Sequence, residues 1–108
     1  MAATKPVIVS RQAQRDIDEA ALHDLTEAGE AVALRFADTL AAAFGLIGRQ
    51  PGIGSPRYTH ALQMSELRSW PLKDFPHVLL YTEQPDAIDV WRVQHGSRDI
   101  PAQPGEPA

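Results

Sequence analysis

The amino-terminal part of the chain places a short apolar run before a longer segment with helical spacing. Residues 7–9 are β-branched and follow Pro6, which is enough for one strand and too little for a helix. Ser10 stands at the N-cap position of a helix predicted over residues 11–28, and Gly29 is expected to end it. Its apolar residues recur at intervals of three and four on one face: Ala13, Ile17, Ala20, Ala21, Leu25 and Ala28.

A second helix is predicted from residue 30 to about residue 50. Its apolar stripe keeps the same spacing through Val32 or Ala33, Phe36, Leu40, Ala43 or Phe44, and Ile47. Pro51 ends it, and the glycines and proline of residues 52–56 indicate a loop. Two helices joined by a single glycine are expected to form an antiparallel hairpin.

From about residue 66 the apolar period changes to two. Residues 67–72 form a weak strand, whose Pro71 suits an edge or a bulge, and residues 77–83 form a stronger one. Residues 84–86 have turn chemistry, so residues 77–95 read as a β-hairpin. Strict alternation in its second strand places Ile88, Val90 and Arg92 on one face, and Asp89, Trp91, Val93 and His95 on the other.

These elements predict an α+β fold with two layers. The order is β-α-α-β-β-β, with the helical hairpin on one face of a mainly antiparallel four-stranded sheet and the other face open. We expect one domain over residues 1–100 and a Pro-rich flexible tail over residues 101–108.

Composition limits the possible classes of protein. Fourteen Asp and Glu outnumber ten Lys and Arg, which disfavours a nucleic-acid binder and favours a protein partner. The chain has no cysteine, which excludes disulfides and thiol catalysis. The best candidate membrane span, residues 32–47, is interrupted by Arg35 and Asp38, and no signal-peptide core is visible, so a cytoplasmic location without membrane contact is expected.

The sequence contains no nucleotide-binding or metalloprotease motif, and the four histidines are too scattered to suggest a metal pair. No metal or cofactor is expected.

Basic residues and histidines do gather toward the carboxyl terminus: Arg57, His60, Arg68, Arg92, His95 and Arg98. Strand alternation would place Arg68 and Arg92 together on the open sheet face, with His95 and Arg98 at its rim. Such a cluster could clamp phosphates, or its members could be solvated ion-pair partners of nearby carboxylates. Trp70 and Trp91 are either buried sheet aromatics or a contact platform.

Several stretches together resemble the ParE branch of the RelE/ParE toxin superfamily. The most specific is the His-Gly-x-Arg-Asp-Ile ending at residues 95–100, which follows the strand sequences of residues 67–72, 78–81 and 88–94. The Pro-x-x-Gly-x-Pro turn at residues 51–56 and the opening pattern of Val7, Ser10, Ala13, Asp16 and Ile17 are also similar. The resemblance covers about residues 6–100.

The resemblance implies a bacterial type II toxin that inhibits DNA gyrase and is neutralised by a ParD-like antitoxin. The alternatives are a RelE-like ribosome-dependent mRNA endoribonuclease and a non-toxic relic that still binds antitoxin. Gyrase inhibition needs no catalytic residue. A nuclease would use His95, Arg98 and Arg68. The expected target-binding residues are Arg68, Trp70, Arg92, His95 and Arg98. The expected antitoxin-binding residues are Ala13, Ile17, Leu25, Phe36, Leu40 and Phe44.

Overall fold

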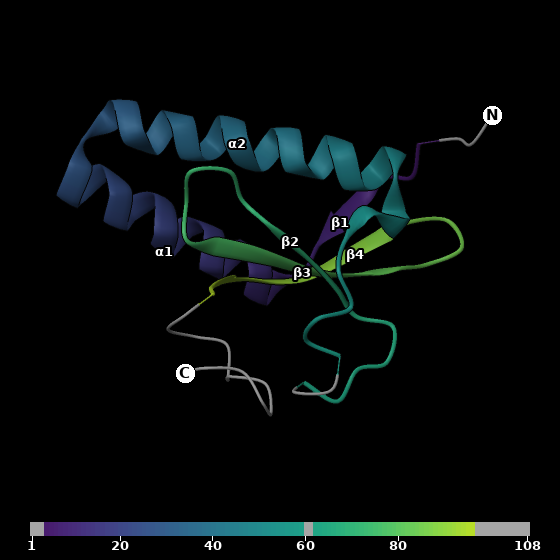
Figure 1. Cartoon of the computed structure of the whole chain (residues 1–108). Coiled ribbons are helices and arrows are strands. Elements are labelled where there is room, and N and C mark those ends of the chain that lie inside the picture. The colour runs from purple at the N-terminus through teal and green to yellow at the C-terminus, as the bar shows by residue number, and fades with distance from the viewer. Residues whose placement is uncertain (1–3, 60–61, 97–108) are drawn as a thin grey trace.

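The computed structural model describes residues 4–59 and 62–96. Within them the chain forms the expected succession of one strand, two helices and three strands, with a short 3₁₀ helix (η1) after the second helix (Figure 1). The element bounds are β1 Val7–Val9, α1 Arg11–Ala28, α2 Glu30–Arg49, η1 Pro51–Ile53, β2 Arg68–Pro71, β3 His77–Glu83 and β4 Ile88–His95. The predicted tail, residues 101–108, lies outside the described residues.

The four strands form one mixed sheet in the order β1-β4-β3-β2. β3 is antiparallel to both β2 and β4, whereas β1 pairs in parallel with β4 from Val7 opposite Ile88 to Val9 opposite Val90. The α+β architecture and the mainly antiparallel sheet are therefore confirmed.

Local sequence explains where the helices begin and turn. The Ser10 hydroxyl accepts a hydrogen bond from the Ala13 amide at 3.0 Å, which is the N-cap arrangement expected from the sequence. Gly29 has φ +93°, and no atom lies within 4 Å of where a Cβ would be, so its backbone conformation alone accounts for glycine. The two helices then pack as an antiparallel hairpin over the sheet (Figure 1).

The main core lies between this hairpin and the sheet. Phe36 and Ile47 of α2 are almost completely buried against Leu79, Tyr81 and Val90 of the central strands. By length and composition alone, α2 could cross a membrane, but in this fold its apolar stripe lines the core of the domain.

The opposite face of the sheet is only partly open, which corrects the prediction. A second buried cluster joins Tyr58 and Leu67, from the segment before β2, to Val78 and Leu80 of β3. The described parts of this segment, residues 57–59 and 62–66, lie on the side of the sheet away from the helices (Figure 1). The sequence prediction missed this layer because residues 57–66 have neither a helical nor a strand period.

A β-bulge changes which side chains of β4 face the helices. Leu80 pairs with Arg92 but the next residue, Tyr81, pairs with Val90, so Trp91 has no opposite residue in β3. Val93 therefore joins Val90 in the core beneath the helices, whereas Arg92 stands opposite Leu80 on the other face. The strict alternation expected for β4 is wrong beyond Val90 for this reason.

Candidate functional site

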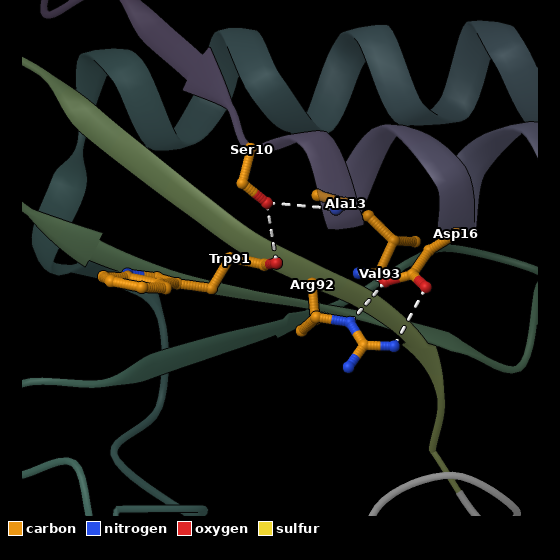
Figure 2. A network of polar contacts seen from close by, with 6 residues as sticks. All are labelled: Ser10, Ala13, Asp16, Trp91, Arg92 and Val93. Atoms are coloured by element: carbon orange, nitrogen blue, oxygen red, sulfur yellow. Dashed lines mark hydrogen bonds and ion pairs between the residues drawn. The ribbon is translucent and has the colours of Figure 1, made fainter.

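The start of α1 covers the outer edge of β4 where β1 has ended. Ser10 donates its hydroxyl hydrogen to the Trp91 carbonyl at 2.9 Å, and the Asp16 carboxylate accepts the Val93 amide at 3.0 Å (Figure 2). Without these side chains, the two backbone groups would lack strand partners, because β1 pairs with β4 only as far as Val90.

Asp16 also holds the guanidinium of Arg92. Its two carboxylate oxygens accept from Nε at 2.7 Å and Nη2 at 3.0 Å (Figure 2). With its amide oxygen turned toward Arg92, Gln94 accepts from the same guanidinium at 3.0 and 3.2 Å. The Asp16 side chain is only 10% exposed, so Arg92 is fixed in one position as part of the fold.

Trp91, the bulged residue, projects from the sheet as an exposed aromatic ring. The residue is 44% exposed, yet its indole nitrogen donates to the buried Thr82 hydroxyl at 2.8 Å. This bond fixes the ring and leaves only its carbon surface for a partner.

A groove of about 640 Å³ lies beside this ring, on the face of the sheet away from the helices. Leu67 and Leu80 form its buried floor, and Leu62, Met64 and Trp91 add apolar surface. Its polar rim consists of Ser10, Arg11, Gln12, Arg92 and Gln94. No carboxylate is among the described residues that line it, although the chain as a whole is acidic.

A second, smaller pocket of about 280 Å³ has the opposite character and lies between α1 and the far ends of β3 and β4. Its ionisable lining residues are Asp16, Glu19, His23, Asp24, His77 and His95. The rings of His77 and His95 meet edge to face with centroids 5.9 Å apart, and Phe36 packs on His77. Across residues 4–59 and 62–96, no three His, Asp or Glu side chains are placed to hold a metal ion.

The residues expected to bind the target do not gather at one place. Arg68 pairs with Tyr81 on the helix side of the sheet, and its Nη1 donates to the Gly52 and Gly54 carbonyls at 3.3 and 2.8 Å. Arg92 is on the opposite face, so the expectation that these two arginines share a face is wrong. The bulge turns Arg92 to the face away from the helices, and the Gly52 and Gly54 carbonyls hold Arg68 on the helix side.

The other expected target residues are dispersed in the same way. Trp70 packs against the core on the helix side, and His95 lines the smaller pocket. Arg98, like His60 in the wider basic set, lies outside the described residues.

Tyr81 is fixed beneath Arg68: its hydroxyl donates to the Pro51 carbonyl at 2.8 Å and accepts from the Gly54 amide at 2.9 Å. Burial raises the pKa of Tyr81, against the opposing effects of the Gly54 hydrogen bond and of Arg68.

The apolar residues expected to bind the antitoxin are mostly used by the core. Ala13, Phe36 and Leu40 are buried between helices and sheet, and Ile17 and Phe44 pack against them. Of that set only Leu25, at 49% exposed, offers a large free surface. The helical spacing that identified these residues is the spacing of a core-facing stripe, so it could not distinguish core from interface.

Sequence reasoning missed the groove. Its floor comes from a segment without periodicity and its aromatic wall from the bulge, so no local pattern brings them together. The sequence feature that could have indicated the groove was Trp91. Strict alternation placed this large aromatic residue on the same face of its strand as Val93.

The helical hairpin packed on one face of a mixed sheet defines a small α+β domain with the RelE/ParE fold. An apolar groove lies on the other face of the sheet. The sequence model of the family described as "ParE toxin of type II toxin-antitoxin system, parDE" matches residues 7–100, and the chain belongs to this family. Its structure is similar to one titled "Chromosomal ParDE TA system from P. aeruginosa", with a TM-score of 0.71 and 16% sequence identity. That match covers 85% of this chain and 96% of the other. At this identity the similarity shows a common fold. No curated protein matches the sequence.

Proposed function

We propose that this ParE-family toxin inhibits DNA gyrase by direct binding, in the cytoplasm, and that a ParD-like antitoxin neutralises it. Family membership supports the class of partner. The observation that carries the mode of action is the separation of Arg68 from Arg92 on opposite faces of the sheet, each held by acceptors within the fold.

A nuclease needs cationic and acid–base groups aimed at one phosphodiester. Here the Arg68 guanidinium is bound to loop carbonyls, Arg92 to Asp16, and His95 lies beside His77 in the smaller pocket. This arrangement favours action by surface contact over RNA cleavage.

The test is induced expression of the full chain with and without the antitoxin encoded beside it. We expect filamentation and a DNA damage response, intact transcripts, and loss of supercoiling by purified gyrase, all reversed by the antitoxin. A core-disrupted variant, Ile47→Asp, controls for the burden of expression. Codon-phased cuts within translated messages would instead assign the chain to the endoribonucleases. Normal growth with demonstrable soluble toxin would identify a relic that has kept only the fold.

A further inference from the structure

We propose that the groove beside Trp91 receives a segment of the antitoxin that carries a large apolar side chain next to a carboxylate. Trp91 is the apolar anchor and Arg11, at the start of α1, is the carboxylate's partner. This inference rests on the proposed function, because it specifies how the antitoxin is recognised.

The apolar half of the groove determines the first feature of its occupant. Leu67 and Leu80 are only 2% exposed at the floor, and the exposed ring of Trp91 stands over them. Since the Thr82 hydroxyl already accepts the indole hydrogen, the ring has no polar group left to offer. A partner therefore gains binding free energy by burying apolar groups against this ring. Aromatic residues of this kind often contribute most of the binding free energy of an interface.

The rim determines the second feature. Among the described residues, two arginines and two glutamines line it without a carboxylate, in a chain where acidic residues outnumber basic ones by fourteen to ten. Arg92 is already bound by Asp16, whereas Arg11 is exposed and forms no ion pair with any described residue. α1 also has no acidic residue in its first turn, so the positive end of its dipole is not offset there. Charge complementarity therefore calls for a carboxylate beside Arg11.

The shape of the groove favours a segment over a flat protein surface. The start of α1 forms one wall and residues 62–67 form the other, with β3 and β4 beneath. A volume of about 640 Å³ is in the range of pockets that enclose a small ligand or a few side chains. An extended or helical peptide segment can reach the floor between such walls, which a flat domain surface cannot.

The two tryptophans of the chain allow coverage of the groove to be measured directly. In a Trp70→Phe background, Trp91 is the only indole, so its emission and its quenching by iodide report its exposure. We expect titration with the full-length antitoxin encoded beside the toxin to shift this emission to the blue and to reduce iodide quenching.

Affinity measurements on variants test the two halves of the recognition. Trp91→Ala is expected to weaken antitoxin binding about 30-fold. Trp91→Phe keeps an aromatic ring and should weaken it less. Arg11→Gln is expected to weaken binding about 5-fold and to make it less sensitive to salt. Leu34→Ala and Arg35→Gln are matched controls, because both residues are exposed on α2, outside the groove, and should change the affinity less than 2-fold. Thermal unfolding of every variant verifies that it is folded.

Tight antitoxin binding with no change in Trp91 emission or quenching would overturn this inference and leave the proposed function intact. Protection of Trp91 by purified gyrase, and not by the antitoxin, would also overturn it, because the groove would then belong to the target. Failure of the antitoxin to bind the unmodified toxin would overturn the proposed neutralisation as well as this inference.

Discussion

Replacing Asp16 by alanine should destabilise the domain more than replacing any other acidic residue of α1. One nearly buried carboxylate accepts three hydrogen bonds, two from the Arg92 guanidinium at 2.7 and 3.0 Å and one from the Val93 amide at 3.0 Å. Alanine would leave the Val93 amide without an acceptor on the edge of β4 and would release Arg92 from its position.

The magnitude follows from the environment of each group. A hydrogen bond to a charged group contributes about 1.5–3 kcal/mol, and an unsatisfied backbone amide costs about 1–3 kcal/mol. The Arg92 side chain is 37% exposed, so solvent screens its part of the interaction and most of the loss comes from the Val93 amide. Allowing for this screening, and for the better helix propensity of alanine, we expect a net loss of about 2 kcal/mol in the free energy of unfolding. Asp16→Asn keeps one acceptor for the amide and should lose about 1 kcal/mol.

Urea unfolding monitored by far-UV circular dichroism provides the assay, with an unchanged m-value as the sign that the folded state is otherwise intact. Asp18→Ala is the matched control, because Asp18 is exposed on the same helix and, among the described residues, hydrogen-bonds through its side chain only to Gln14. A loss below about 0.5 kcal/mol for Asp16→Ala, comparable to an ordinary surface substitution, would refute the reasoning.

Three further predictions follow from other contacts. Ser10→Ala removes the N-cap of α1 and the bond to the Trp91 carbonyl, so we expect a loss of about 1–2 kcal/mol by the same urea assay, and Ser10→Asp should restore the cap but not the donor to Trp91. Gly54→Ala would drive a Cβ into the Tyr81 ring and hydroxyl, so we expect a loss of about 1–3 kcal/mol, whereas Gly52→Ala, whose Cβ would meet nothing, is the neutral control. Because burial raises the pKa of Tyr81 in the folded state, the neutral hydroxyl is the form that the fold favours. Its contribution is therefore fully present below the unfolded tyrosine pKa of about 10 and is lost as the pH rises through the folded pKa. Unfolding free energies measured between pH 8 and 11 should fall more steeply for the wild type than for Tyr81→Phe, and parallel curves would contradict this.

Periodicity and caps were sufficient to predict most of the elements. Ser10, Gly29 and Pro51 mark helix boundaries through their own backbone chemistry, so the two helices begin and end where the sequence indicates. The strand from His77 to Glu83 is almost wholly buried. Its sequence is therefore a nearly continuous apolar run, which is a strong signal for a strand.

The site was harder to predict because its geometry depends on contacts between distant residues. The bulge at Trp91 reverses the faces of Arg92 and Val93, and only the pairing with Leu80 and Tyr81 reveals it. Arg68 likewise finds its acceptors at Gly52 within η1 and at Gly54 just after it, rather than on an open face. An arginine in a sequence shows that a charge is present, but its position depends on which carbonyl or carboxylate the fold brings within reach.

The parallel pairing of β1 with β4 has a consequence for how the toxin matures. Among the described strands β1 pairs only with β4, the last of them in the sequence, so this sheet cannot be completed until β4 has been synthesised. Ser10 and α1 are held beside Trp91 and Val93 by hydrogen bonds to β4, so one wall of the groove depends on β4 being in place. Contacts between such distant parts of a chain form slowly. The groove that we propose for the antitoxin is therefore complete only once these two distant parts of the chain have met.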